Sequence, residues 1–342
     1  MAGAGCSGDL YAGWRELMGL LTDEARLVDP NFPPFDEKLY DYLSYADKFK
    51  ITIGTKYHNV IFTEYGRSVP HLKHHETLVS LPFKGITTTN YDEVLERAII
   101  AVTRKPASSV WISNDVEEAK IAQFLASLNN RDPLDQVFHI HGISHAKTSI
   151  ILCGEEYRDK YGFSDKQLPS TLFQEIKEGN INEKQFEELV RKHGLKWTTH
   201  RKILWSLLAT RRVLFIGFSF SDPYFKRMLE YVSEDLHTYN LANHYLVLRV
   251  TASSKDRDFL RARELKRKYG VETVFFGDEE GSYKGLEQFI EEMGQRIGSV
   301  KPAQPVQVDT PLQVDTPQVA ALDPDLTARL MKISRGRHNN ED

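Results

Sequence analysis

The sequence predicts an α/β fold built on a doubly wound, mostly parallel sheet. Short strand-like segments recur through residues 1–298. Several of them are apolar along their whole length, as expected of parallel strands that are buried on both faces. Helical patterns separate the segments, and this alternation favours a parallel sheet with helices on both sides.

The expected elements follow from these patterns. We expect strands at 60–63, 84–89, 137–141, 149–153, 212–218, 244–250 and 271–276. We expect helices at 11–21, 92–102, 116–129, 203–210, 222–236 and 284–297. The stretch from about 155 to 210 carries charged, mostly helical sequence, including 171–179 and 182–193. We interpret it as a helical insertion that forms a small lobe or a lid.

The composition changes after residue 298, so the predicted domain covers residues 1–298. Residues 299–322 are interpreted as a Pro-rich linker, because four prolines and a repeated Gln-Val-Asp-Thr-Pro leave too little apolar surface to offset ordering. In 323–342, the spacing of Leu326, Leu330 and Ile333 predicts a short helix within a disordered C-terminal tail. That helix is either loosely attached or docks a partner, and its shortness favours the first.

The bulk composition excludes several classes of protein. The 342 residues carry a net charge of −4, so direct nucleic-acid binding is not expected. No apolar run approaches the roughly 20 residues of a membrane span, and the N-terminus does not resemble a signal peptide. A cytoplasmic protein is therefore expected. The two cysteines, Cys6 and Cys153, exclude a disulfide framework and a four-cysteine zinc site.

A glycine-rich motif stands at the N-terminus. Residues 3–8 read Gly-Ala-Gly-Cys-Ser-Gly, which matches G-x-G-x-x-G. Such glycines let the backbone approach a pyrophosphate, and the amides of a following helix face its charge. However, only Met1 and Ala2 precede the motif where a strand is expected. Either the first strand is lost through a mis-set start, or the loop is supported differently, or the segment is a flexible terminus.

A second motif follows the strand expected at 84–89. Thr89, Asn90 and Asp92 end that strand, and a helical pattern begins at once. Polar side chains at a strand tip point into the crevice where open α/β sheets bind ligands. An alternative reading is a capping box, in which Asn90 caps the helix together with Glu93.

Two histidines end the strand expected at 137–141. His139 and His141 share one face of a regular strand, which raises the possibility of a metal site. No cysteine or carboxylate stands nearby at ligand spacing, so a pocket imidazole at His141 that exchanges a proton is favoured over metal. The alternative is a half-buried structural histidine. The remaining histidines of interest, His71, His74 and His75, lie in a polar stretch and are expected to be solvated.

A third strand end reads Gly-Phe-Ser-Phe-Ser-Asp-Pro at 217–223. Gly217 permits close approach of a ligand, and Ser219 offers a hydroxyl. Asp222 either caps the next helix, with Pro223 in its first position, or binds a ribose hydroxyl.

Taken in order, these motifs resemble the SIR2-like (sirtuin-related) NAD-binding domain, a Rossmann-like fold. The resemblance covers about residues 3–297. Deacetylating sirtuins carry a four-cysteine zinc ribbon that this chain lacks, so the closest resemblance is to SIR2-like domains of bacterial antiphage defence systems. The residues that carry the resemblance are Gly3–Ser7 with Trp14, Thr88–Asp92, His141-Gly142, Tyr157, Gly217–Asp222 and Tyr269–Glu272.

The resemblance implies hydrolysis of NAD to nicotinamide and ADP-ribose, with no metal, in an immune effector that depletes NAD. Asn90 would hold the ribose and the attacking water, His141 would accept a proton, and Asp92 would stabilise positive charge or orient Asn90. The amides of 4–7 would hold the diphosphate. The remaining cofactor-binding residues implied are Gly3, Ala4, Gly5, Ser7, Trp14 and Thr89, with Gly217, Ser219 and Asp222 on the adenosine side.

The resemblance also implies partners. Such effectors are expected to be gated by homo-oligomerisation or by an activating protein: an Argonaute-like protein, a helicase-like ATPase or a sensor. Two other functions remain open at this point. One is an NAD-dependent protein deacylase, and the other is a non-catalytic module that senses NAD or ADP-ribose.

Overall fold

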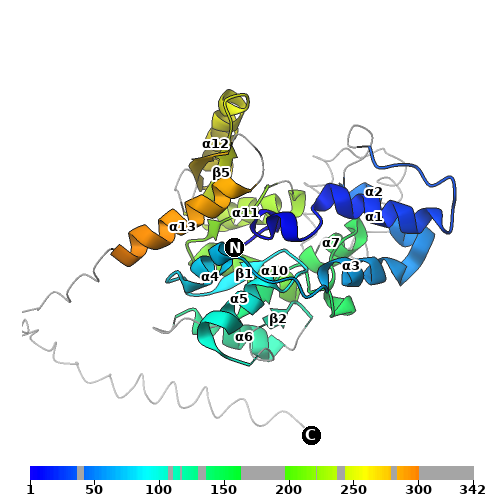
Figure 1. Cartoon of the computed structure of the whole chain (residues 1–342), viewed down its shortest axis with the longest axis horizontal. Coiled ribbons are helices and arrows are strands. Elements are labelled where there is room, and N and C mark those ends of the chain that lie inside the picture. The colour runs from blue at the N-terminus through cyan, green and yellow to red at the C-terminus, as the bar shows by residue number, and fades with distance from the viewer. Residues whose placement is uncertain are drawn as a thin grey trace, which may run out of the picture. The chain divides into compact units, whose positions relative to one another are not determined.

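A parallel β-sheet in two halves lies at the centre of the fold (Figure 1). The computed structural model describes residues 1–36, 42–106, 111–115, 118–129, 136–162, 197–220, 222–236, 243–278 and 283–299. One half has the order β1 (Ile86–Thr88), β3 (Val137–His139), β2 (Trp111–Ser113). The other half has the order β4 (Leu214–Phe215), β5 (His244–Val250), β6 (Val271–Gly277). All pairs of neighbouring strands within the two halves are parallel.

The first two residues of the chain join the two halves. Ala2 forms parallel bridges to Thr88 in β1 and to Ile216, which directly follows β4. The Ala2 N–H donates to Thr87 O at 2.8 Å, and the Ile216 N–H donates to Met1 O at 3.0 Å. Met1 and Ala2 therefore occupy the place in the sheet, between β1 and β4, where a first strand was expected. The sheet changes its direction of winding beside them, which makes this the switch point where such sheets bind ligands.

Helices cover both faces of the sheet. Along β3 and β5 successive buried side chains alternate between two hydrophobic cores: Val137 and Val247 belong to one core, and Phe138 and Leu246 to the other. The first core includes α1 (Trp14–Arg26), α2 (Tyr42–Ile53), α3 (Tyr57–Tyr65), α4 (Lys73–Ser80), α5 (Val94–Thr103) and α13 (Lys284–Ser299). The second includes α6 (Glu118–Ser127), α7 (Gly154–Tyr161), α10 (Thr199–Thr210), α11 (Pro223–Leu236) and α12 (Lys255–Tyr269). The predicted doubly wound α/β fold is thus confirmed.

Most expected strands are present, but two are wrong. Residues 60–63 lie within α3, where Ile61 is fully buried and Phe62 is exposed, so packing overrides the β-branched run. Residues 149–153 do not form a strand. Ser149 ends a short 3-10 helix (Lys147–Ser149), and the Ile151 N–H donates to His141 O at 2.9 Å. Strand β2 was not expected.

The predicted insertion is described only in part. Its ends are α7 and α10, whereas the helices expected at 171–179 and 182–193 lie outside the described residues. The expected tail, 323–342, and all of the linker after Ser299 also lie outside them. Met1–Ser299 form one compact unit. Within the described ranges, no helix has the length and apolar character needed to cross a bilayer.

The glycine motif is a short 3-10 turn, η1 (Ala4–Cys6), pressed against the end of β4. A Cβ on Gly5 would lie 2.9 Å from Gly217 Cα, and a Cβ on Gly217 would lie 2.4 Å from Cys6 N. Gly217 also has a φ of 63°, in the left-handed region. The backbones at Gly5 and Gly217 therefore approach each other so closely that neither position has room for a side chain.

Two histidines of α4 hold this turn from outside, which corrects the expectation that they are solvated. His74 and His75 are buried. The His75 Nε2–H donates to Cys6 O at 2.7 Å, and the Leu72 N–H donates to His75 Nδ1 at 2.9 Å. Burial lowers the pKa of His75 to about 4, so the ring is neutral near pH 7.

We expect Gly217→Ala to destabilise the protein by at least about 2 kcal/mol, because the new methyl group meets Cys6 N and the backbone is left-handed. Gly19→Ala is the matched control. Gly19 lies in α1 with nothing within 4 Å of the added Cβ, so alanine stabilises the helix by roughly 0.5–1 kcal/mol. Chemical denaturation measures both free energies of unfolding. Equal stability of the two variants contradicts the close approach.

Candidate functional site

A cavity of about 560 Å³ opens at the carboxyl ends of the strands around the switch point. Its size is typical of small-molecule sites. Every site residue expected from the sequence lines it: Asn90, Asp92, His141, Gly3, Ala4, Gly5, Ser7, Trp14, Thr89, Gly217, Ser219 and Asp222. Most of them converge because of topology: they come directly after β1, β3 or β4, or after the bridges of Ala2, and parallel strands end at one edge of the sheet.

Asn90 is tied to the glycine turn. Its Nδ2 donates to Ser7 Oγ at 2.9 Å and to Gly3 O at 3.2 Å. Both amide hydrogens are therefore used within the chain, and Oδ1 is the atom left for a ligand. The capping-box alternative is wrong, because Glu93 is the N-cap of α5 and makes no side-chain cap hydrogen bond.

Asp92 completes a chain of hydrogen bonds from Asn90. The Ser7 hydroxyl donates to Asp92 Oδ2 at 2.8 Å, and the Val94 N–H donates to Asp92 Oδ1 at 3.1 Å. Burial raises the pKa of Asp92, while these two hydrogen bonds oppose the rise. The Ser7 hydroxyl thus links the carboxyl group of Asp92 to the carboxamide of Asn90.

His141 lies between two tyrosines of α7. Its Nε2 is 3.0 Å from Tyr161 Oη, and its Nδ1 is 3.3 Å from Tyr157 Oη. Asp222 Oδ2 is 3.6 Å from the same Nε2. Burial lowers the pKa of His141 to about 3, so its neutral form, which accepts a proton, dominates near pH 7.

The two histidines of the β3 end do not converge. His139 Nδ1 donates to the backbone carbonyl of Asn90 at 2.9 Å, and its Nε2 contacts Glu96. His141 instead follows the strand, in a turn, and faces the cavity. The same-face expectation therefore fails because the strand ends at His139. In the described part of the chain, no group of three metal-ligating side chains occurs.

Asp222 confirms the first alternative weighed for it, the cap of the next helix. Its Oδ1 accepts the Phe225 N–H at 3.0 Å, as a cap of α11, while Oδ2 faces His141. Burial raises the pKa of Asp222 to about 6. Asp222 lines the same cavity as Gly217 and Ser219.

The amides of the glycine turn are largely occupied. The N–H groups of Gly5, Cys6 and Ser7 donate to the carbonyls of Gly217, Gly3 and Ala4 respectively. Within the described residues the Ala4 N–H makes no hydrogen bond. Of the amides of residues 4–7 that were expected to hold a diphosphate, it is therefore the one available. Helix α1 also starts later than expected, at Trp14.

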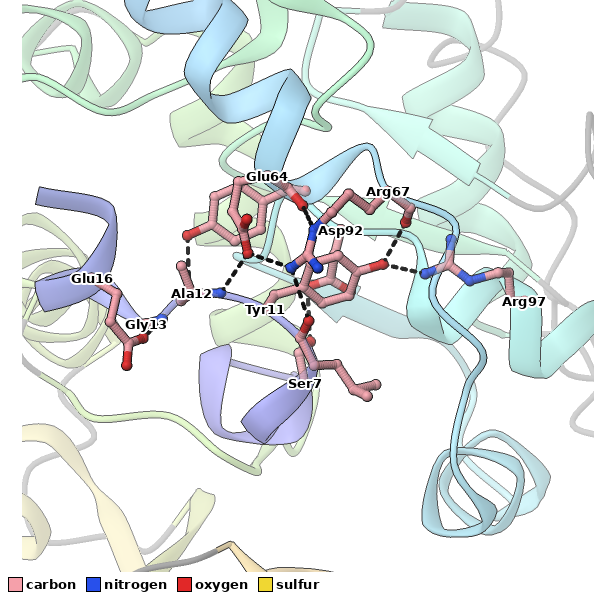
Figure 2. A network of polar contacts seen from close by, with 11 residues as sticks. Ser7, Tyr11, Ala12, Gly13, Glu16, Glu64, Arg67, Asp92 and Arg97 are labelled. Carbon is pink, nitrogen blue, oxygen red and sulfur yellow. Dashed lines mark hydrogen bonds and ion pairs between the residues drawn. The ribbon is translucent and has the colours of Figure 1, made fainter. Parts of the chain in front are cut away.

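Figure 2 shows how the segment after the glycine turn is fixed. The Glu64 carboxylate accepts the Ala12 N–H at 2.9 Å and contacts Arg67 at 2.6 Å. The Tyr11 hydroxyl donates to Arg67 O at 2.8 Å and accepts from Arg97 at 2.5 Å. Tyr11 and Ala12 line the cavity, so α3 and its C-terminal turn hold one cavity wall in place.

Sequence reasoning missed several residues here. Tyr161, Glu96 and the pair Glu64–Arg67 carry no motif, since their partners are distant in the chain. A usable signal existed for Tyr161: it follows Tyr157 by four residues, which places both rings on one face of a helix.

The SIR2-like domain family matches residues 84–274, more than half of the chain. The chain therefore belongs to the SIR2-like domain family. Among curated proteins, it is similar to the NAD(+) hydrolase ThsA of Enterococcus faecium, with 26% identity over 253 residues, or 72% of this chain and 42% of that protein. The NAD(+) hydrolase ThsA of Bacillus cereus (strain MSX-D12) is 24% identical over 225 residues, or 65% and 37%. The chain spans about two fifths of the length of these relatives.

We expect Asp222→Asn to stabilise the folded protein at pH 7. Burial raises the pKa of Asp222 to about 6, so the unfolded chain loses this proton first and wild-type stability falls as pH rises from about 4 to 6. Asparagine does not titrate and keeps the cap. The gain is at most about 3 kcal/mol at pH 7 and vanishes below about pH 4.

Thermal unfolding at pH 4 and at pH 7.5 measures this difference. The control is Asp256→Asn, because Asp256 is exposed in α12. A gain for Asp222→Asn of the same size at both pH values contradicts the proposed ionisation.

Proposed function

We propose that this protein is an NAD hydrolase that cleaves the bond between nicotinamide and ribose, giving nicotinamide and ADP-ribose. The observation that carries the proposal is one cavity that brings Asn90, Asp92 and His141 together beside a glycine turn at the switch point of the sheet. Membership of the SIR2-like domain family and similarity to two NAD(+) hydrolases support it.

Cleavage of this bond passes through a cationic, oxocarbenium-like state at the ribose. The carboxyl group of Asp92, held by Ser7 and by the Val94 N–H, supplies negative charge near that centre. Nicotinamide leaves as a neutral base with the electrons of the broken bond. The positive charge of the nicotinamide ring in the substrate thereby disappears.

The attacking water needs a hydrogen-bond acceptor that orients it and a base that takes its proton. Asn90 Oδ1, oriented because both amide hydrogens are bound, accepts a hydrogen bond from the water or from a ribose hydroxyl. Neutral His141 takes a proton from the water or from that hydroxyl. Asp222, 3.6 Å from His141 Nε2, stabilises the resulting imidazolium and returns the proton to solvent. Water adds to the ribose carbon, and one proton is released.

The glycine turn would bind the diphosphate through the Ala4 amide, and Gly217 and Ser219 would contact the adenosine part of NAD. Trp14, which lines the cavity and lies 5.9 Å from the Tyr42 ring, would cover the substrate. NAD is therefore the substrate, and the chemistry proposed needs no metal.

The cellular role that we propose is depletion of NAD in antiphage defence. The resemblance to defence-type SIR2-like domains supports this role. Because constant depletion is toxic, activity would be gated by homo-oligomerisation or by a partner: an Argonaute-like protein, a helicase-like ATPase or a sensor. Residues 323–342 would be the first place to look for such a contact.

We expect Asn90→Ala and His141→Ala each to lower the rate of NAD cleavage by at least about 100-fold, since one removes the water's acceptor and the other the base. Asn31→Ala is the control, because Asn31 is exposed in a loop. Nicotinamide release, measured by chromatography, gives the rates, and circular dichroism verifies folding. Undiminished turnover in both variants refutes the assignment.

A further inference from the structure

A buried ion pair lies behind Asn90, outside the cavity lining. His139, the last residue of β3, is 0% exposed, and Glu96, in the first turn of α5, is 3% exposed. His139 Nε2 contacts Glu96 Oε1. Burying two ionisable groups costs free energy that the pair alone does not reliably recover. A fold that keeps such a pair next to its candidate site therefore suggests a role beyond stability.

The His139–Glu96 pair binds the backbone of Asn90, whose side chain is central to the candidate site. His139 Nδ1–H donates to Asn90 O at 2.9 Å. This carbonyl belongs neither to β1, which ends at Thr88, nor to α5, which begins at Val94. No backbone ladder satisfies it, and without the imidazole it would be a buried acceptor lacking a partner.

Both partners of the ring, the Asn90 carbonyl and the Glu96 carboxylate, are acceptors, which favours its doubly protonated form. Burial alone would lower the pKa of His139, but the Glu96 carboxylate and the Asn90 carbonyl outweigh burial and raise it. Asp92 raises it further. A protonated ring donates from both nitrogens, so it binds Glu96 and Asn90 at the same time.

The remaining hydrogen bonds of Asn90, together with the one from His139, fix the orientation of this residue. Its N–H donates to Thr88 Oγ1 at 3.0 Å, and its Nδ2 donates to Gly3 O and Ser7 Oγ. With its carbonyl bound by His139, the residue is fixed at both ends of its backbone and at its side chain. The orientation of Oδ1 is thereby fixed, in a residue that lines the cavity.

We propose that the Glu96–His139 pair is a positioning device that fixes the Asn90 carbonyl and thereby aims the Asn90 carboxamide oxygen at the reacting water or ribose. The proposal rests on the proposed hydrolase function. His139 and Glu96 do not line the cavity and do not touch substrate, so they act through Asn90.

The variant His139→Leu removes the donor and should lower kcat for NAD at least ~30-fold while KM stays within ~3-fold, because a misplaced group harms the transition state more than binding. Glu96→Gln is the conservative variant. A neutral His139 still donates from Nδ1 to Asn90 O while its Nε2 accepts from the glutamine amide, so kcat should stay within ~3-fold of wild type.

The matched control is His244→Leu. His244 is also a buried strand-end histidine, 3% exposed at the start of β5, and it does not line the cavity. Its loss should lower the melting temperature and leave kcat within ~3-fold. All rates are compared well below the melting temperature of each variant.

If His139→Leu does not fold, His139→Asn takes its place. The asparagine amide keeps a donor near the position of the His139 Nδ1, so kcat within ~10-fold of wild type is expected.

Three kinetic results overturn the proposal: wild-type kcat in His139→Leu, an equal loss of kcat in His244→Leu, or a loss in Glu96→Gln as large as in His139→Leu. If His139→Asn is the variant measured, a loss beyond ~10-fold does the same. If the wild-type chain alone leaves NAD intact, as the proposed gating allows, there are no rates to compare. The positioning device is then judged by a crystal structure of His139→Leu, or of His139→Ala if that variant does not fold. A displaced Asn90 carboxamide supports it, and an unmoved one overturns it.

Discussion

The site depends on the hydrogen bonds that place Met1 and Ala2 between β1 and β4. These bonds join two three-stranded sheets into one parallel sheet with its switch point beside the joining segment. The glycine turn follows this segment directly, Asn90 follows β1, and Gly217 follows β4. One set of backbone contacts therefore brings three distant parts of the chain to the same cavity, and glycine at 5 and 217 lets them touch.

Burial shifts the pKa of two ionisable groups that line the cavity. Burial raises the pKa of Asp222 to about 6 and lowers that of His141 to about 3. A buried carboxyl and a neutral imidazole 3.6 Å apart form a pair that can exchange a proton once a substrate enters. Sites of this kind are commonly built at a cost in folding free energy. Burial raises the pKa of Asp92 as well, while the hydrogen bonds from Ser7 and Val94 oppose the rise.

The sequence predicted what is local. Strand ends, helix patterns and the strand-end motifs at Asn90, His141 and Asp222 could be read directly, because parallel topology sends them to one edge. It could not predict what depends on distant packing. The burial of His75 against Cys6, the pairing of Glu96 with His139 and the helical state of 60–63 are tertiary effects that no local pattern encodes. The start of α1 at Trp14, by contrast, has a local signal, because Glu16 accepts the Gly13 N–H at 2.5 Å.

The central claim is that this cavity transfers ADP-ribose to water. Incubating the full wild-type chain with NAD and an equimolar acetyl-lysine peptide, and identifying the products by mass, tests it most directly. Free ADP-ribose and nicotinamide in equal amounts, with the peptide unchanged, is the result that the account predicts. Acetyl-ADP-ribose with a deacetylated peptide would contradict it.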